Sequence, residues 1–161
     1  MHWATDEAWS DKLDHLLTRV DKLLATYENV AIVGVSAGAS AAINVYAMRR
    51  QQIVGCALIA GKIHGAPAIG ENYRQENPAF FDSVRTCEQA VASLTEAELK
   101  RILSRYAVFD TRLQRSDSYI AGANNRVVPT IGHTFTIAVQ ILFGAPSFLS
   151  FLKAQSIESK P

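Results

Sequence analysis

Apolar and polar residues follow one another along the chain in blocks that indicate helices and strands in alternation. From Asp6 to Tyr27, leucines and valines recur every three or four residues between charged positions, which predicts an amphipathic helix. The runs Asn29–Val35 and Ile53–Ala60 are apolar at nearly every position, as is typical of strands that are covered on both faces. The small residues of Ala39–Arg50 predict a second helix between these strands.

The second half of the chain continues the alternation. Two helices are predicted between Asn77 and Leu103, because Pro78 suits the first turn of one and Thr95-x-x-Glu98 forms a capping box for the next. The most apolar stretch, 131–152, contains polar and turn residues that favour a buried helix, a turn and a further helix over a membrane span. The remaining predicted elements are two strands and one helix: Tyr106–Phe109, Arg126–Pro129 and Thr134–Phe143.

This order of elements predicts a single α/β domain over residues 1–161. Strands that are separated by helices pair in parallel, so we expect a three-layer α/β/α fold with a short, mostly parallel sheet. The carboxyl ends of parallel strands meet at one edge of the sheet, where ligands bind in such folds. The helices within about 62–105 form an insertion between the second and third strands.

Composition narrows the possible functions without changing this picture. The 161 residues include 16 Lys and Arg against 15 Asp and Glu, and there is no long basic run, which argues against nucleic-acid binding. Cys56 and Cys87 are the only cysteines, and their separation suits neither a disulfide framework nor a metal site. The expected location is the reducing cytoplasm, since the first residues lack the pattern of a secretory signal, and no membrane contact is expected.

The sequence Gly34-x-Ser36-x-Gly38 lies between the first predicted strand and a helix. In that position the pattern is typical of a nucleophile elbow, in which the serine has a strained backbone and the glycines let strand and helix approach closely. Two other interpretations remain open: a tight turn of small residues, and a phosphate-binding loop over 34–40. The phosphate loop is the weaker of these, because the chain has neither G-x-G-x-x-G nor Gly-Lys-Ser/Thr.

A nucleophilic serine needs a base, and the base needs a carboxylate that orients it. Asp110 follows the third predicted strand and His133 follows the fourth, so both are expected at the same edge of the sheet as Ser36. Asp117 is the rival acid, although its Ser-Asp-Ser context also suits a turn. The remaining acids and histidines rank lower, the histidines as structural or solvent-facing residues: Asp82, Glu71, His2, His15 and His64.

These residues resemble the α/β-hydrolase fold family, which uses the chain order Ser, Asp, His. The last predicted strand leads into Gly132-His133, as in the family's approach to its catalytic histidine, and the resemblance extends over about residues 6–153. It implies that Ser36 is the nucleophile, His133 the general base and Asp110 the residue that orients the base. The sequence after Asp110 departs from the family's frequent Asp-x-x-Val-Pro.

The resemblance also implies an oxyanion hole and a substrate pocket. The backbone N–H of Ala37, directly after the nucleophile, would donate to the oxyanion. The insertion would cover the site as a lid, and its aromatic side chains would form an apolar pocket, although they suit the inner face of a packed helix equally well. This chemistry needs neither a cofactor nor a metal. The pocket residues would be Phe80, Phe81 and Tyr73, with Val84 beside them.

The chain departs from the family before the nucleophile strand. Only one helix precedes that strand here, whereas several strands precede it in the family. The early loop that supplies a second oxyanion donor is missing with them, and loss of one such donor lowers turnover by roughly 10²–10³. Because the strand 29–35 is left with a bare outer edge, we expect either a homodimer through this strand or pairing with a missing amino-terminal segment.

Together these features predict a serine hydrolase, and specifically a carboxylesterase whose substrate is a small hydrophobic acyl ester. The alternative is a non-catalytic, truncated hydrolase scaffold that binds a partner or dimerises through the strand edge. The reactivity of Ser36 distinguishes the two.

Overall fold

The computed structural model describes residues 7–65, 75 and 77–158. Helices and strands alternate along the chain as the sequence predicts. The elements are α1 (Trp9–Leu24), β1 (Val30–Val35), α2 (Gly38–Met48), β2 (Ile53–Ile59), α4 (Pro78–Ala92), α5 (Glu96–Lys100), β3 (Ile102–Phe109), α6 (Arg115–Ser118), β4 (Asn124–Ile131), α7 (His133–Phe143) and α8 (Ala145–Glu158).

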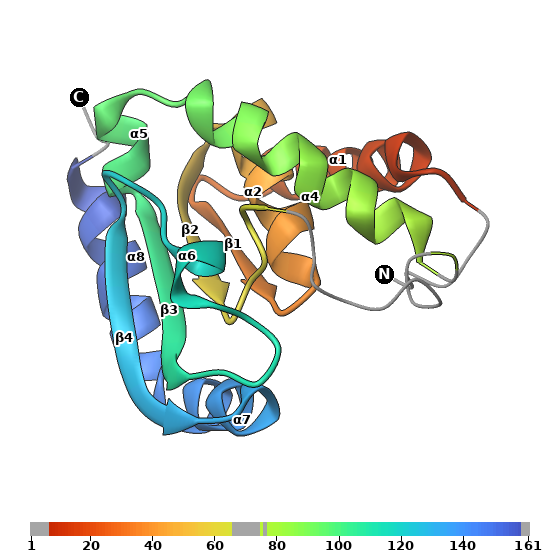
Figure 1. The fold of residues 1–161 in the computed structure, drawn as a ribbon. Coiled ribbons are helices and arrows are strands. Elements are labelled where there is room, and N and C mark those ends of the chain that lie inside the picture. Colours follow the sequence, from red (N-terminus) through yellow and green to blue (C-terminus); the bar gives the residue numbers. More distant parts are fainter. Residues whose placement is uncertain (1–6, 66–74, 76, 159–161) are drawn as a thin grey trace.

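The strands form one sheet in the order β1-β2-β3-β4, and every neighbouring pair is parallel (Figure 1). The predicted α/β class with a parallel sheet is therefore confirmed. β3 begins at Ile102, so the prediction of a helix that extends to Leu103 is wrong. Both residues are almost fully buried opposite Cys56 and Ala57 of β2, and this burial within the sheet overrides the helical pattern.

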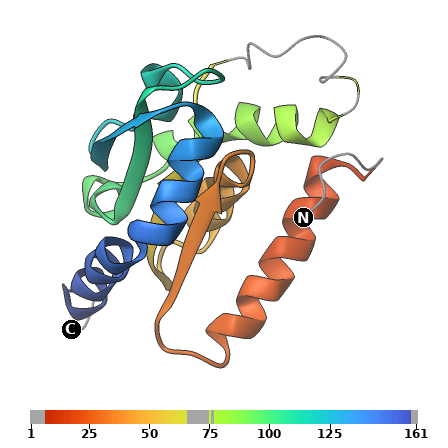
Figure 2. The same cartoon turned by 90° about the horizontal axis from the view of Figure 1, so that it is seen from below.

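Helices cover both faces of the sheet, which gives the expected three layers (Figures 1 and 2). On one face α2 packs against β1 and β2, while α1 and α4 pack against α2. Ile43 and Tyr46 are fully buried in the core of this face. On the other face α8 packs against β2, and α7 packs against β3 and β4, around the buried residues Leu103 and Phe148.

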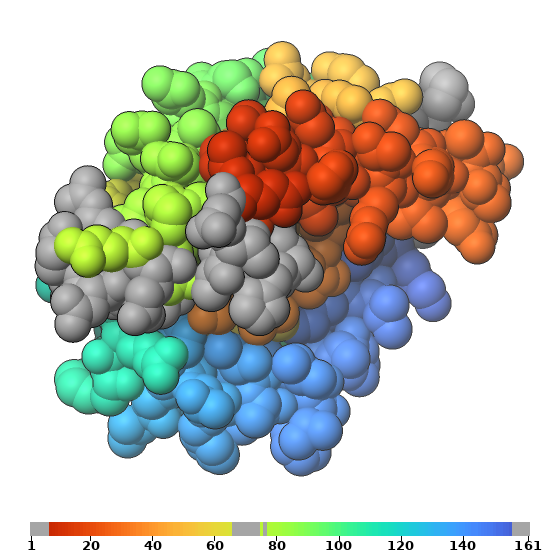
Figure 3. Space-filling view, turned by 90° about the vertical axis from the view of Figure 1, so that its right-hand side faces the viewer, coloured from red at the N-terminus to blue at the C-terminus, as the bar shows by residue number. Residues whose placement is uncertain are grey.

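The two edges of the sheet are β1 and β4. Figure 3 looks toward the β1 side of the molecule, with α1 in red and orange above and the helices α7 and α8 in blue below. Among the described residues, no other strand pairs with the outer side of β1.

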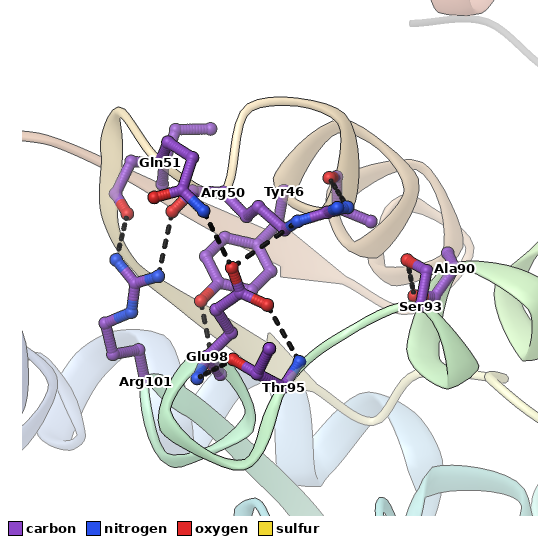
Figure 4. A network of polar contacts seen from close by, with 10 residues as sticks. Tyr46, Arg50, Gln51, Ala90, Ser93, Thr95, Glu98 and Arg101 are labelled. Carbon is purple, nitrogen blue, oxygen red and sulfur yellow. Dashed lines mark hydrogen bonds and ion pairs between the residues drawn. The ribbon is translucent and has the colours of Figure 1, made fainter.

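α5 begins with the predicted capping box. The hydroxyl of Thr95 accepts from the backbone N–H of Glu98 at 3.3 Å, and the carboxylate of Glu98 accepts from the N–H of Thr95 at 2.8 Å (Figure 4). The same carboxylate accepts from the side-chain amide of Gln51 at 3.1 Å and lies 3.4 Å from Arg50 Nε. Glu98 therefore both caps α5 and fastens it to the turn after α2.

A buried arginine holds the bend between α7 and α8. The guanidinium of Arg105, on β3, donates to Gln140 Oε1 at 2.6 Å and to the hydroxyl of Ser147. Its carbon Cζ lies 4.1 Å from the centroid of the Phe148 ring, which adds a cation–π contact. Burial lowers the pKa of Arg105, although an arginine stays charged at any ordinary pH.

α7 is buried along one side only. Ile141, Leu142 and Phe143 are 57%, 71% and 77% exposed, so the expectation of a buried helix is wrong for its second half. In the part of the chain that the structure describes, no single helix is long and apolar enough to cross a membrane. The helices His133–Phe143 and Ala145–Gln155 are long and apolar enough for a membrane span only when they are counted together. They are bent by 66° relative to each other.

Candidate active site

Ser36 lies in the turn that joins β1 to α2. Its backbone φ is 51°, in the left-handed region that residues with a side chain rarely adopt. The N–H of Ser36 donates to the carbonyl of Ile59 at 2.8 Å, which continues the ladder between β1 and β2 into the turn. The structure therefore places a strained serine between a strand and a helix, as the motif suggests.

The glycines beside Ser36 differ in what they do. A Cβ at Gly34 would lie 2.6 Å from the Cβ of Ala42 and 2.7 Å from the Cα of Ala39, so Gly34 allows β1 and α2 to approach closely. A Cβ at Gly38 would meet nothing within 4 Å, so the expectation that both glycines serve close approach is wrong for Gly38. Gly61, which the motif does not include, serves it instead, since its Cβ would collide with that of Ala39.

A tight turn after β4 presents His133. Gly132 has a φ of 89°, which only glycine adopts readily. Its N–H donates to the carbonyl of Phe109 at 2.8 Å, and its carbonyl accepts from the hydroxyl of Thr136 at 2.8 Å. α7 consequently begins at His133, one residue before the predicted start.

Asp110 directly follows β3, the neighbour of β4. The register between these strands shifts between Ala107 and Phe109, so that Phe109 pairs with Ile131. Because the residues after both strands then lie side by side, Asp110 comes within reach of His133.

The three predicted side chains form one chain of hydrogen bonds. Ser36 Oγ lies 2.8 Å from His133 Nε2, and His133 Nδ1 lies 2.9 Å from Asp110 Oδ2. The other carboxylate oxygen accepts from the N–H groups of Arg112 and Leu113 at 2.7 and 3.1 Å, which fixes the orientation of the carboxylate. When Nδ1 donates to the carboxylate, Nε2 has a lone pair for the serine proton.

Most of this chain of hydrogen bonds is buried. The side chains of His133 and Asp110 are 5% and 6% exposed, and Ser36 is a half-buried residue. A buried pair is screened little by water and salt, so the contact between Asp110 and His133 is stronger than the same contact at the surface. Ser36 keeps some exposure to solvent.

The rival acid, Asp117, points elsewhere. Its carboxylate forms an ion pair with Lys62 Nζ at 2.8 Å and accepts from the N–H of Gln114 at 2.9 Å. The carbonyl of Asp117 also accepts from the N–H of Ile63 at 2.7 Å. Asp117 thus ties the loop after β2 to α6, and Asp110 is the carboxylate that contacts His133.

The predicted oxyanion donor, the backbone N–H of Ala37, is at the start of α2. None of the described residues accepts a hydrogen bond from it. The positive end of the α2 dipole lies at this position, which favours a developing negative charge.

Two of the three predicted pocket residues lie next to each other on α4. Phe80 is 4% exposed on α4, and its ring meets that of Phe81 edge to face, with centroids 5.6 Å apart. Val84, one turn further along α4, is 3% exposed, and α4 packs against α2, the helix that follows Ser36. Tyr73 lies outside the described residues, and the lid role of the insertion stays a prediction.

The lower-ranked histidines and acids do not join the chain of hydrogen bonds at Ser36. His15 is 76% exposed and lies 2.8 Å from a carboxylate oxygen of Glu7, and His64 lies 4.0 Å from Glu88. Asp82 pairs with Arg85 at the surface, at 2.9 Å. His2 and Glu71 lie outside the described residues.

The cysteines do not provide a competing nucleophile. Cys56 and Cys87 are both free and fully buried, and burial raises the pKa of each thiol. Over the described ranges there is also no group of three or more His, Cys, Asp or Glu side chains that could hold a metal ion.

A cavity of about 360 Å³ lies at the opposite end of the sheet from Ser36. Its lining comes from the start of β2, the end of α1 and the turns between elements, including Tyr27, Asn29, Gln51, Ile53 and Arg101. It is therefore separate from the carboxyl ends of the strands, where the three hydrogen-bonded side chains meet.

Comparison with known proteins shows which solved structures have a similar fold. No model of a protein family matches the chain, and no curated protein matches it either. Among solved structures, it is similar to a serine hydrolase of the polyaromatic-hydrocarbon-degrading bacterium Cycloclasticus zankles, with a TM-score of 0.53 and 17% identity over 89% of this chain and 75% of that one.

Two further structures have the same likeness. The serine hydrolase CarC, involved in carbazole degradation, gives a TM-score of 0.56 and 14% identity over 93% of this chain and 74% of that one. A deformylase of Pseudomonas putida S16 gives a TM-score of 0.53 and 16% identity over 84% of this chain and 75% of that one. The chain therefore has the α/β-hydrolase fold in its sheet and covering helices, as the resemblance of its motifs implies.

Proposed function

We propose that the chain is a serine hydrolase, and specifically a carboxylesterase. The observation that carries the proposal is the continuous hydrogen-bonded chain from Ser36 through His133 to Asp110 at the carboxyl ends of β1, β4 and β3. The left-handed backbone of Ser36 and the likeness of the fold to that of serine hydrolases support it.

In the first half of the reaction, Ser36 Oγ attacks the acyl carbon of an ester while His133 Nε2 takes the serine proton. Asp110 stabilises the resulting imidazolium through Nδ1. The N–H of Ala37 donates a hydrogen bond to the negatively charged carbonyl oxygen. His133 then gives its proton to the leaving alcohol, and the acyl group remains bonded to Ser36.

In the second half, water replaces the alcohol. His133 takes a proton from the water, the hydroxide attacks the acyl carbon, and the proton returns to Ser36 as the carboxylic acid leaves. Because only one oxyanion donor is assigned, we expect turnover roughly 10²–10³ below that of a site with two donors.

The substrate we propose is a small ester with an apolar acyl or alcohol part. Phe81 of α4 supports this choice, since it is a half-buried apolar side chain on the helix that packs against α2, beside the buried Phe80 and Val84. Neither the residues nor the fold favours a charged substrate.

Labelling with a fluorophosphonate, followed by intact-mass measurement, tests the nucleophile without a guess about substrate. We expect one adduct per chain, lost in Ser36→Ala and in His133→Ala. Ser93→Ala is the matched control, because Ser93 is an exposed serine whose hydroxyl donates to the carbonyl of Ala90, and it should label like the unchanged protein. A series of p-nitrophenyl esters of increasing chain length then tests the preference for small apolar esters.

The outcome that contradicts the proposal is a folded protein without an adduct at millimolar probe, or an adduct that survives Ser36→Ala. The first result would favour the alternative function, a scaffold that binds a partner and does no chemistry.

A further inference from the structure

Two arginines lie side by side on neighbouring strands of the sheet. The register between β3 and β4 pairs Arg105 with Arg126, and residues that pair in this way point to the same face. That face is the one covered by α7 and α8, because Arg105 contacts Gln140 and Ser147 there. Neighbouring strands are about 4.8 Å apart, so the two positive side chains start close together.

The described residues supply no negative charge for this pair. Neither arginine forms an ion pair with a described carboxylate. β3, β4 and α7 contain no Asp or Glu, and α8 has none before its last residue. Burial, and then the nearby charge of Arg126, lowers the pKa of Arg105. Two like charges that face each other without a counter-ion are destabilising, and an anion between them would remove the repulsion.

Arg105 retains a hydrogen-bond donor that the fold does not use. The residue is 6% exposed, and two of its guanidinium nitrogens donate to Gln140 and Ser147, which are both neutral. The third nitrogen, Nε, is buried and has no hydrogen-bond partner among the described residues. A buried donor without an acceptor is unfavourable, and in a positively charged side chain it indicates a place for an anion.

Arg126 gives this place access to solvent. β4 is an edge strand of the sheet, and Arg126 is exposed on it, with no hydrogen-bond partner in the described part of the chain. An anion that approaches over β4 therefore meets Arg126 first and Arg105 one strand further in. The planar fork of a guanidinium donates two parallel hydrogen bonds to the oxygens of a phosphate or a carboxylate.

We propose that Arg105 and Arg126 bind a phosphate group. Two guanidinium charges match a phosphate monoester, which carries about −1.5 to −2 charges at pH 7, whereas a carboxylate balances only one of them. Arg105 precedes Asp110 by five strand positions, so the phosphate site lies roughly 16 Å from the hydrogen-bonded chain at Ser36. This inference does not depend on the proposed hydrolase activity.

Titration of the ¹⁵N-labelled full chain with inorganic phosphate, followed through the arginine Nε–Hε signals, tests the site. The signals of Arg105 and Arg126 should shift together and reach saturation. Arg126→Gln should weaken phosphate binding at least about tenfold, because it removes a charge-assisted contact. Arg19→Gln is the matched control, since Arg19 is an exposed arginine of α1, on the other face of the sheet, and its loss changes the net charge equally. We expect it to change the affinity by less than about twofold.

Urea unfolding gives a second readout. Without phosphate, Arg126→Gln should unfold at the same urea concentration as the unchanged protein or at a higher one, because the repulsion between the arginines is gone. In saturating phosphate, compared with chloride of equal ionic strength, the unchanged protein should gain stability through binding and Arg126→Gln should gain little. Arg105 is left in place, because its contacts with Gln140 and Ser147 hold the bend between α7 and α8.

Vesicles distinguish the two sources of such a phosphate group. Sedimentation with phosphatidylcholine vesicles only when they contain phosphatidic acid, lost in Arg126→Gln, would identify a lipid headgroup. Binding of inorganic phosphate without sedimentation would identify a soluble phosphate compound, and either result supports the site.

Three results would overturn the proposal. Neither inorganic phosphate at millimolar concentration nor the acidic vesicles could bind. Arg126→Gln and Arg19→Gln could weaken binding equally, which would show only general attraction to positive charge. Acetate at the same concentration could shift the two arginine signals as far as phosphate does, and the site would then not select a phosphate group.

Discussion

At the scale of single residues, the site depends on a strained backbone conformation that the surrounding structure enforces. Ser36 has a side chain in the left-handed region, a conformation that costs about 1–3 kcal/mol and persists only where the surroundings enforce it. The ladder bond to Ile59 and the close packing of α2 on β1 supply that enforcement. The stability of the turn at Ser36 therefore depends on the residues that let α2 pack closely on β1.

Gly34→Ala tests that conclusion. Its new Cβ would meet Ala42 and the backbone of α2 at less than 3 Å, so we expect the free energy of unfolding in urea to fall by about 1–3 kcal/mol. Fluorophosphonate labelling should slow as the turn is pushed apart.

Gly38→Ala is the matched control from the same motif. A Cβ there meets nothing within 4 Å, and the expected change in stability is within about 0.5 kcal/mol. Equal losses from both substitutions would show that close packing of β1 on α2 is not what Gly34 provides.

At the scale of elements, short helices are held by side chains that reach neighbouring elements. α5 has only 5 residues, too few to be stable from its own hydrogen bonds. Glu98 compensates by capping α5 and contacting Gln51 and Arg50, while the hydroxyl of Tyr46 on α2 donates to the Glu98 carbonyl at 2.8 Å. The hydrogen bond from Thr95 N–H lowers the pKa of the Glu98 carboxyl, with the nearby hydroxyl and arginines adding to the effect.

Glu98→Gln should therefore destabilise the protein in a pH-dependent way. A carboxyl with a lowered folded-state pKa contributes stability above its unfolded pKa, and this contribution is lost as the pH falls through the folded value. We expect a loss of about 1–2 kcal/mol at pH 7, and a difference that closes as the pH falls below the usual 4.5 of glutamate, measured by urea unfolding across pH.

Glu96→Gln on the same helix is the control. Glu96 is 79% exposed and, among the described residues, pairs with Lys100 alone, so its removal should change stability by less than about 0.5 kcal/mol. A loss for Glu98→Gln that does not shrink in acid would mean that the carboxylate charge is not the source of the effect.

At the scale of the whole molecule, several large apolar side chains are left uncovered. The sheet has one edge without protective residues, and the exposed side of α7 carries large apolar side chains. Contiguous apolar surface of this kind marks a place where another molecule binds or where aggregation begins.

Leu142→Gln combined with Phe143→Gln tests whether this part of α7 is free. Because both side chains are more than 70% exposed, we expect stability to change by less than about 0.5 kcal/mol for each, while binding of a hydrophobic dye falls. Ile137→Gln is the contrasting variant, since Ile137 packs against the buried cluster and its loss should cost about 2 kcal/mol or more. A large destabilisation by the Leu142 and Phe143 pair would show that they are covered.

The sequence by itself determined the order of elements, the parallel sheet and the positions of Ser36, Asp110 and His133 at strand ends. Those features are local, since apolar runs specify strands, and the residues after parallel strands share one edge whatever the packing. It also determined the cap of α5, because a capping box closes within four residues.

Only the tertiary structure decided between Asp110 and Asp117, because each is a carboxylate in a turn and the difference lies in contacts with Lys62 and His133. It likewise decided that Ile102 and Leu103 belong to β3, that Gly61 rather than Gly38 allows close approach to α2, and that one side of α7 is uncovered. Each of these depends on which residues distant in the chain come to lie opposite one another. Which side chains are buried, which atoms would collide and which residues a carboxylate contacts all depend on that arrangement. The periodicity of the sequence does not specify them.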